Sequence, residues 1–399
     1  MRRFLLAITT WEWLLLLFML PLLLLPSPAP LVAAVPIPMF WLIRKVSTGR
    51  FWPPSPYNLS VAAILLALLI GITTFFDIQQ GAAKLSGVLL GTELLLAVIE
   101  HCRRKKSGVW RIVAAVVLSG MGIVLLAIVY GDWARAAPQL ALLQSRLMGQ
   151  FNTVFGPRLM LASTVNLNEL AGVMAWVVPL LIALAIGQTP KFWRSGWAGR
   201  AAALILTAAA VISGIILLAT QSRGGVAATI LAVLVMAALS FSWGRWLLLA
   251  GLLGGLISLF FLGNQLMFAP SAVSVETIGL QGRLEIWSSG IAALSDFPFT
   301  GTGLNNFRQL VHVLYPLPSV SPTLDIAHAH NHLLQAGLDL GIPGLVAYMS
   351  LWLVAAGLLW YALRQPGSTN HSLRVLQIGL AGSLSAGWLF GILDAVALG

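Results

Sequence analysis

The stretch Ile326-Ala-His-Ala-His-Asn-His-Leu-Leu-Gln335 lies near the end of the longest polar interval of the chain, from about Gly263 to Gly341. Four of the six histidines fall in this interval, and long apolar runs precede and follow it. A membrane helix cannot use so polar a stretch, because polar groups in lipid cost free energy. We therefore expect the polar interval to leave the membrane and to carry, or cover, a functional site.

The composition is typical of a protein that lies mostly in lipid. Hydrophobic residues make up 59% and charged residues 9% of the chain, and the mean hydropathy is +0.91. A soluble domain is about 25% charged, so these few charges cannot cover a surface in water. Cys102 is the only cysteine, which excludes an intrachain disulfide and a zinc site built on cysteines.

Apolar runs divide the chain into candidate membrane spans, since about 20 apolar residues cross a bilayer core. The first two runs flank Pro26-Ser-Pro-Ala-Pro30 and form either a helical hairpin or one kinked unit. We expect a single integral membrane domain over 1–399, all-α and polytopic, with about 11–12 transmembrane helices and one large, partly helical loop at 264–342. The candidate runs are 11–25, 31–44, 59–76, 84–101, 109–130, 167–187, 200–220, 224–242, 244–263, 343–363 and 374–396.

Basic residues in short loops predict the orientation of the chain. With the N-terminus in the cytoplasm, most of the 23 lysines and arginines lie inside and most of the 12 acidic residues lie outside. The segments 131–166 and 264–342 then face the periplasm or the cell exterior. This asymmetry accounts for the net charge of +11, so nucleic acid is not an expected partner. We expect a multi-pass protein of the cytoplasmic (inner) membrane.

Seven basic residues lie on the outer side and break the inside preference, and two of them are arginines in recognisable motifs. Arg223 lies in Thr220-Gln-Ser-Arg-Gly-Gly225 between two apolar runs, where a charge is costly unless it reaches the interface or a partner. It is either a ligand-binding residue, with glycines that let the backbone approach the ligand, or a snorkelling residue in an interfacial turn. Arg283 opens an amphipathic helix that Leu284, Trp287, Ile291 and Leu294 predict. Its alternative role is an ion pair with Glu285 or a lipid headgroup.

The spacing of His328, His330 and His332 leaves three chemistries open. In an extended strand all three share one face, whereas in a helix they fan out. We expect a helix that starts near 328–331 and ends at Gly341-Ile-Pro-Gly344. The histidines then serve as general bases, as metal ligands or as a helix-capping cluster. Carboxylate support for a metal is thin, so neither a metal nor another cofactor is expected.

Another apolar run begins with polar residues, which we expect on the same outer side of the membrane as Arg223 and Arg283. In Asn166-Leu-Asn-Glu-Leu-Ala-Gly172, Asn166 and Asn168 either cap a helix or bind a sugar or phosphate, and Arg158 precedes them. Two or three guanidinium groups at a membrane surface match a diphosphate, which arginine binds bidentately. A histidine beside them suits the activation of a hydroxyl.

These motifs, in their order along the chain, resemble the O-antigen ligase and O-antigen polymerase superfamily. The resemblance is clearest over 160–345. It rests on Asn166-Leu-Asn-Glu-Leu-Ala171, Gln221-Ser-Arg-Gly-Gly225, Gly282-Arg-Leu-Glu-Ile-Trp287, Gly301-Thr-Gly303, His328-Ala-His-Asn331 and Gly341-Ile-Pro-Gly344.

The resemblance implies a metal-independent, inverting membrane glycosyltransferase. Such enzymes move a glycan from an undecaprenyl-diphosphate carrier to lipid A–core, to a growing polymer or to a protein, at the outer face of the membrane. The family's histidine corresponds to His330, with His328 as the alternative. The two family arginines, which bind the diphosphate, correspond to Arg223 and Arg283; Arg158 is a further expected ligand because of its charge on the same side. Other expected site-lining residues are Asn166, Asn168, Gln221, Asn331 and Asp394, the last of which otherwise caps its span.

A different class of function stays open beside the enzyme. A secondary transporter or flippase for an anionic or lipid-linked solute would favour charges near the bilayer midplane. Only Glu93 lies deep in a predicted span, which favours the glycosyltransferase.

Overall fold

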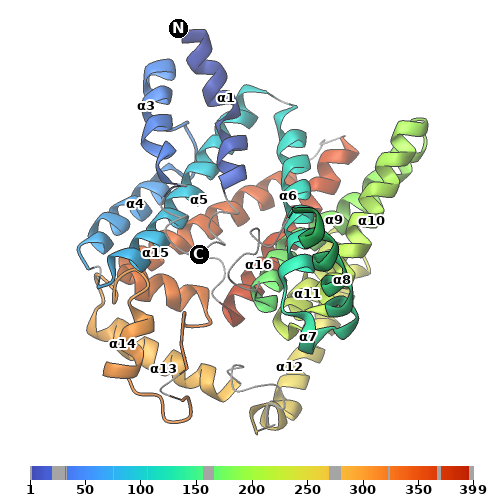
Figure 1. The fold of residues 1–399 in the computed structure, drawn as a ribbon. Coiled ribbons are helices and arrows are strands. Elements are labelled where there is room, and N and C mark those ends of the chain that lie inside the picture. Colours follow the sequence, from blue (N-terminus) through green and yellow to red (C-terminus); the bar gives the residue numbers. More distant parts are fainter. Residues whose placement is uncertain are drawn as a thin grey trace. The chain divides into compact units, whose positions relative to one another are not determined.

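The computed structural model describes residues 2–19, 32, 34–74, 76–105, 107–155, 166–268, 280–321, 324–365 and 370–394. Within these ranges the chain forms α-helices joined by loops, without a β-strand (Figure 1). The expected all-α, polytopic membrane fold is confirmed.

Seven helices of the described ranges are long and apolar enough to cross a membrane. These seven helices are α5 (Ile78–Arg104), α6 (Gly108–Tyr130), α9 (Leu167–Trp193), α10 (Trp197–Ala219), α11 (Arg223–Ser240), α15 (His332–Arg364) and α16 (His371–Leu393).

The remaining candidate spans also overlap helices. These are α1 (Arg2–Met19), α3 (Pro36–Thr48), α4 (Asn58–Ile72) and α12 (Gly244–Phe268). Within the part of the chain whose side chains the structure describes, three of them contain shorter apolar helices, Leu5–Met19, Asn58–Ile72 and Gly244–Ser258. The segment 131–166 contains α7 (Trp133–Ala136) and α8 (Pro138–Phe155).

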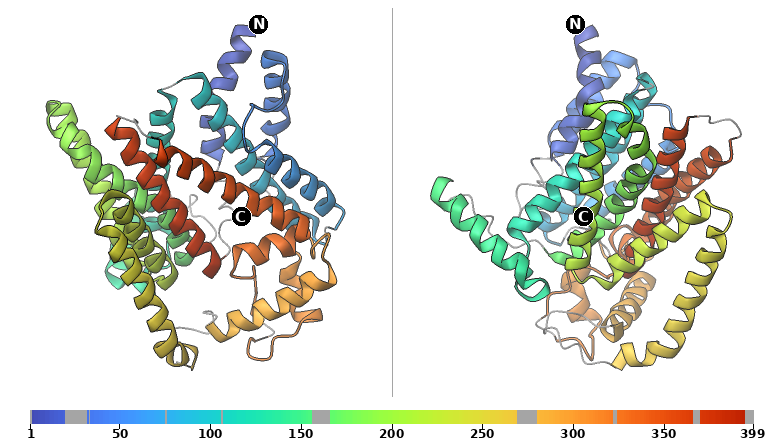
Figure 2. Two further views of the ribbon diagram at one scale, coloured as in Figure 1. Left: turned by 180° about the vertical axis from the view of Figure 1, so that it is seen from behind. Right: turned by 90° about the vertical axis from the view of Figure 1, so that its right-hand side faces the viewer.

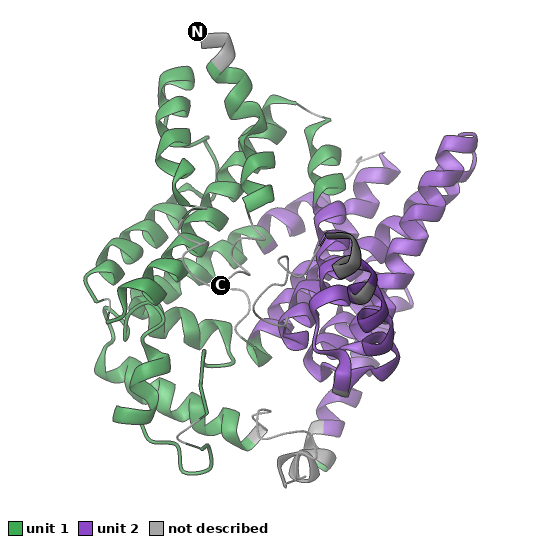
Figure 3. Cartoon of the chain, in the orientation of Figure 1, with its two compact units in different colours: residues 1–115, 260–355, 392–399 green, residues 116–259, 356–391 purple. Residues whose placement is uncertain are grey.

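The chain divides into two compact units (Figure 3). Unit 1 comprises 1–115, 260–355 and 392–399, and therefore holds the polar interval. Unit 2 comprises 116–259 and 356–391, and holds the motif around Arg223.

In unit 1, α1, α3 and α5 pack against one another, as both views of Figure 2 show. Trp13, Phe40 and Leu90 are among the buried residues of this packing. Arg44 is buried with them and forms ion pairs with Glu12 and, at 2.6 Å, with Glu93. A buried cation is tolerated here because two carboxylates surround it.

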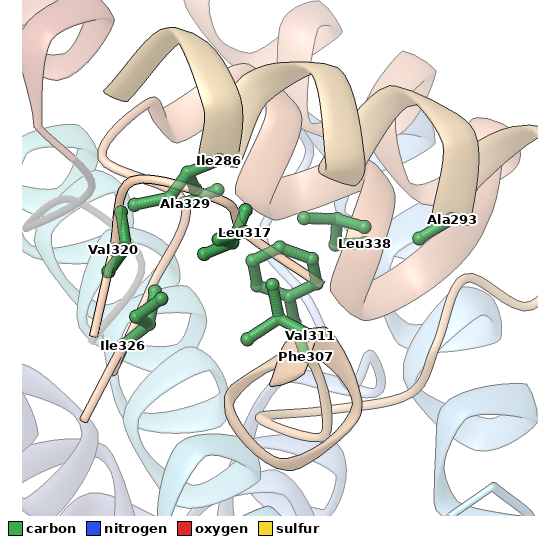
Figure 4. Packing of buried hydrophobic residues seen from close by; sticks show 9 residues of the cluster. All are labelled: Ile286, Ala293, Phe307, Val311, Leu317, Val320, Ile326, Ala329 and Leu338. Carbon is green, nitrogen blue, oxygen red and sulfur yellow. The ribbon is translucent and has the colours of Figure 1, made fainter. Parts of the chain in front are cut away.

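The polar interval has a hydrophobic core of its own (Figure 4). α13 (Leu280–Asp296) and α14 (Phe307–Leu314) pack with the start of α15, and Phe307 lies among Val311, Leu317 and Leu338. The interval is therefore a folded layer that can hold side chains in defined positions.

α13 is a helix as expected, but its buried face differs from the predicted one. Ile286 and Ala293 are fully buried, whereas Leu284 and Ile291, which we expected on the packed face, are 44% and 59% exposed. Periodicity alone does not identify the packed face of such a helix, because both of its faces carry apolar residues.

The turn Thr300-Gly-Thr-Gly303 has a structural role. The Thr302 backbone N–H and hydroxyl both donate to the Leu338 carbonyl oxygen, at 2.7 and 2.9 Å. Gly301 has φ +65°, and a Cβ there would lie 2.3 Å from the same oxygen. The glycine is thus required for close contact between this turn and α15.

In unit 2, α9 packs against α10 and α11. α16 also approaches α9, and the Ser383 hydroxyl donates to the Trp176 carbonyl oxygen at 2.7 Å. This packing places the beginning of α9 beside the beginning of α11, where two of the sequence motifs start.

Candidate functional site

Two histidines and one aspartate form the most clearly organised polar cluster of unit 1. The rings of His328 and His330 lie edge to face with centroids 4.3 Å apart. Nε2 of His328 and Nδ1 of His330 each lie 3.5 Å from the same oxygen, Oδ1 of Asp394. Asp394 directly follows α16 and is 2% exposed. We call these three residues the histidine cluster.

The backbone at His330 adopts a conformation that is rare for any residue with a side chain. Its φ is +49°, in the left-handed region. Such a conformation costs about 1–3 kcal/mol and persists where the surrounding structure holds it. It turns the chain so that His328 and His330 face one carboxylate, although the segment is not a regular strand.

The hydrogen bonding of His328 defines its tautomer. The His330 backbone N–H donates to Nδ1 of His328 at 3.2 Å, so this nitrogen is an acceptor. The proton of the neutral ring is then on Nε2 and faces Asp394. Burial is the main cause that lowers the pKa of His328 to about 4; His330, Lys84 and Arg283 act in the same direction, and Asp394 opposes them. His328 is therefore neutral at pH 7.

His332 does not join the other two histidines. It is fully buried, its Nδ1 lies 2.9 Å from the Tyr348 hydroxyl, and its ring meets Tyr348 and Trp352 edge to face. The three histidines therefore do not share one face, because α15 begins at His332 and this side chain lies in the core.

The histidine cluster also has the donor set of a metal site. His328, His330 and Asp394 each offer a ligand atom, and these atoms lie within 4.8 Å of one another. Two imidazoles and a carboxylate suit a divalent transition metal. The same geometry suits a base held by a carboxylate, so it does not by itself decide between the two.

Asn331 fixes the start of α15 beside the cluster. Its Oδ1 accepts hydrogen bonds from the backbone N–H groups of Leu333 and Leu334, both at 3.0 Å. Its Nδ2 donates to the Ile392 carbonyl oxygen at 3.2 Å, two residues before Asp394. The helix thus begins close to the predicted position and is broken at Gly341, where φ is +71°.

A buried polar chain supports the loop between the two histidines. Nζ of Lys84, on α5, lies 2.7 Å from Oδ2 of Asp339. Nε2 of Gln335 donates to Oδ1 of Asp339 at 3.0 Å, and its Oε1 accepts from the Ala329 backbone N–H at 2.8 Å. Sequence reasoning missed Lys84 and Gln335, although a lysine at the start of an apolar run is a signal for a buried partner.

Arg283 lies in the first turns of α13. Its Nε is buried and has no hydrogen-bond partner among the described residues, and Glu285 instead accepts from the Ser319 backbone N–H at 2.9 Å. The alternative of an ion pair with Glu285 was therefore wrong. The Trp287 indole donates to the Ala329 carbonyl oxygen at 2.9 Å, which links α13 to the histidine loop.

The motif residues of unit 2 form a second group. Asn166 caps α9 by accepting from the Asn168 backbone N–H at 2.8 Å. Oδ1 of Asn168 accepts from the Ser222 hydroxyl at 2.7 Å, and Ser222 caps α11 by accepting from the Gly225 N–H at 3.2 Å. Sequence reasoning named Gln221 but missed Ser222, whose place before an apolar run is a capping signal.

Arg223 is the first residue of α11. It is exposed, and the described part of the chain holds no acidic partner within ion-pair distance of it. A guanidinium at a helix N-terminus adds to the positive end of the helix dipole, which favours anions. Gly225 serves packing, since a Cβ there would lie 2.9 Å from Ala171 Cβ.

Gln221 has a left-handed backbone, with φ +55°, and its Nε2 donates to the Ala136 carbonyl oxygen at 2.6 Å. This bond ties the turn before α11 to α7. Arg158, the third predicted diphosphate ligand, lies outside the described residues.

Residues 208–349 match the family model described as O-antigen ligase. The matched segment contains Arg223, Arg283, His328, His330 and Asn331. None of the curated proteins matches the chain. The family match confirms the resemblance to the O-antigen ligase and polymerase superfamily within this segment, and that family implies a glycosyltransferase-like enzyme.

Proposed function

Because residues 208–349 carry the O-antigen ligase family model, we propose that this chain transfers a glycan from an undecaprenyl-diphosphate carrier to an acceptor hydroxyl. The reaction takes place at the outer face of the cytoplasmic membrane. The acceptor is lipid A–core, a growing polysaccharide or a protein, which the shared motifs do not distinguish. The observation that supports this proposal most is the pairing of His330 with the buried Asp394.

His330 is the proposed general base. The Asp394 carboxylate, 3.5 Å from Nδ1, favours the tautomer with a proton on that nitrogen. Nε2 is then free to take a proton from the acceptor hydroxyl. The hydroxyl oxygen forms a bond to the anomeric carbon as the bond from this carbon to the diphosphate oxygen breaks. A single in-line displacement of this kind inverts the anomeric configuration.

Arg283 and Arg223 are the proposed ligands of the diphosphate, and Arg158 is a third. The buried, unpartnered Nε of Arg283 and the exposed guanidinium of Arg223 support these roles. Arginine binds phosphate oxygens bidentately and keeps its charge at any working pH. The charge that develops on the departing diphosphate is stabilised by these groups, so no metal ion is required.

Transfer of a radiolabelled undecaprenyl-diphosphate oligosaccharide by the purified full chain in EDTA tests the proposal. The wild type should be active, and His330→Ala, Arg223→Ala and Arg283→Ala should each lose at least about 100-fold in rate. His371→Ala is a matched control, because His371 is an exposed histidine of unit 2 whose Nε2 lies 3.1 Å from the Gly187 carbonyl oxygen.

Normal transfer by the His330 and arginine variants would contradict the proposed roles. Loss of wild-type activity in EDTA, with recovery on adding a divalent metal, would assign the histidine cluster to a metal instead. Movement of the labelled donor between leaflets without modification of any acceptor would favour the transporter.

A further inference from the structure

A cavity of about 520 Å³ lies in unit 1 where α3 ends and α4 begins, and shares no residue with the histidine cluster. Its lining residues are Trp41, Arg50, Phe51, Trp52 and Asn58. We propose that this cavity binds the headgroup of an anionic phospholipid that also carries hydroxyl groups, of the phosphatidylglycerol type. The proposal does not depend on the glycosyltransferase function.

The walls of the cavity are held by buried groups. The Trp41 indole donates to Oε2 of Glu93 at 2.5 Å, and Arg44 donates to the Phe51 carbonyl oxygen at 3.0 Å. Glu93 and Arg44 belong to the buried ion pairs between α1, α3 and α5. Gly49, with φ +81°, ends α3 and turns the chain into the loop. The cavity is thus preformed, which lowers the entropic cost of binding.

The charge around the cavity favours an anion. Arg50 lines it, and Nζ of Lys45 lies 5.0 Å from the centre of the Phe51 ring; both cations are exposed. Residues 36–58 contain no aspartate or glutamate, so no acidic group of this segment neutralises the two cations. A phosphodiester is the anion that a bilayer offers at this position, and basic residues beside apolar helices bind such headgroups.

Two polar atoms of the lining indicate more than a phosphate. Within the described residues, Nε1 of Trp52 and Oδ1 of Asn58 are buried and have no hydrogen-bond partner. An indole N–H suits a phosphate oxygen, whereas an amide oxygen needs a donor, which a phosphodiester lacks. Glycerol hydroxyls supply this donor. An ethanolamine ammonium also donates, but its headgroup is zwitterionic and does not match two cations.

The surroundings suit the acyl chains of the same lipid. Leu42, Val46 and Leu59 flank the cavity in sequence and are 60%, 63% and 82% exposed. Tryptophan and arginine next to such apolar surface are typical of the membrane interface. The predicted orientation puts this loop at the cytoplasmic face, where anionic headgroups are available.

Native mass spectrometry of the purified full chain, titrated with phosphatidylglycerol, phosphatidic acid or phosphatidylcholine, tests the proposal. The wild type should bind phosphatidylglycerol at least about 10-fold more tightly than phosphatidylcholine. Arg50→Ala should abolish this preference, and Arg245→Ala, at an exposed arginine of α12, should retain it. Asn58→Ala should weaken the binding of phosphatidylglycerol more than the binding of phosphatidic acid. Trp52→Phe, which keeps an aromatic ring but removes the N–H, should weaken the binding of both anionic lipids.

Equal binding of phosphatidylglycerol and phosphatidylcholine would overturn the proposal. An equal loss of the preference for phosphatidylglycerol in Arg50→Ala and Arg245→Ala would also overturn it, because it would indicate non-specific attraction between basic residues and anionic lipid. Displacement of phosphatidylglycerol by inorganic phosphate at similar concentration would assign the cavity to a soluble anion instead.

Discussion

His330 combines a left-handed backbone with a ring nitrogen 3.5 Å from a buried carboxylate. The left-handed backbone is unfavourable unless the fold holds it, and strained residues gather at functional sites. The pairing makes Asp394 a positioning residue for the proposed base, in addition to its place at the end of α16. His328 is neutral, accepts a hydrogen bond through Nδ1, and presents its Nε2 to the same oxygen of the carboxylate.

Replacement of the carboxylate tests this positioning role. We expect Asp394→Asn to lower the rate constant of transfer by about 100-fold with little change in KM, because an amide holds the His330 tautomer poorly. The rate of the variant should rise to a plateau at a different pH from the wild type, which a purely structural change would not produce. Asp325→Asn, in the exposed pair with Arg308, should keep the wild-type profile.

The lowered pKa of His328 predicts how the free energy of unfolding depends on pH. Its pKa is lowered from 6.5 to about 4 in the folded chain, so the folded state disfavours the charged ring. The contribution of neutral His328 to the free energy of unfolding is fully present above pH 6.5 and is lost as the pH falls toward 4. It amounts to at most about 3 kcal/mol. Thermal unfolding in detergent should show a smaller decrease between pH 7 and pH 4.5 for His328→Gln than for the wild type; equal decreases would contradict this assignment.

At the scale of elements, α5 and α15 are joined by a charge pair rather than by apolar contacts alone. Lys84 and Asp339 are 8% and 2% exposed, and their ion pair continues through Gln335 to the histidine loop. The Asn305 backbone N–H also donates to Asp339, at 3.0 Å. One buried carboxylate thus holds the Thr300–Asn306 turn, the start of α15 and the loop that carries His330.

Breaking the pair of Lys84 and Asp339 should lower the free energy of unfolding, and a second substitution should restore most of it. Lys84→Met leaves the Asp339 carboxylate buried without its cation, which costs about 3–5 kcal/mol. The melting temperature in detergent should fall, and transfer should fall with it. Lys84→Met combined with Asp339→Asn should recover most of the stability, because no uncompensated charge remains. A double variant no more stable than Lys84→Met would show that the pair is not the coupling element.

At the scale of the whole molecule, charge asymmetry predicts which loops face the cytoplasm. Ser195, between α9 and α10, and Ser295, near the end of α13, are both exposed and lie on opposite predicted sides. In a Cys102→Ser background, Ser295→Cys should react with a membrane-impermeant maleimide in intact cells. Ser195→Cys should react only after permeabilisation. The reverse pattern would invert the orientation and place the histidine cluster on the cytoplasmic side.

The helices and the membrane class follow from the sequence, because hydropathy, caps and breaks are local properties. The apolar runs all overlap helices, and Asn331 and Gly341 bound the segment predicted between them. The arginine and histidine motifs are equally readable, since they lie in short contiguous stretches that the family match covers.

Only the tertiary structure decided which of these residues meet. Asp394 is far from His330 in sequence and reaches it through the end of α16, whereas the nearby His332 turns into the core. Lys84 on α5 pairs with Asp339 on α15, and Glu285 accepts from the Ser319 backbone N–H instead of pairing with Arg283. A residue's type limits the chemistry open to it, but its partner depends on long-range packing, which no local pattern encodes.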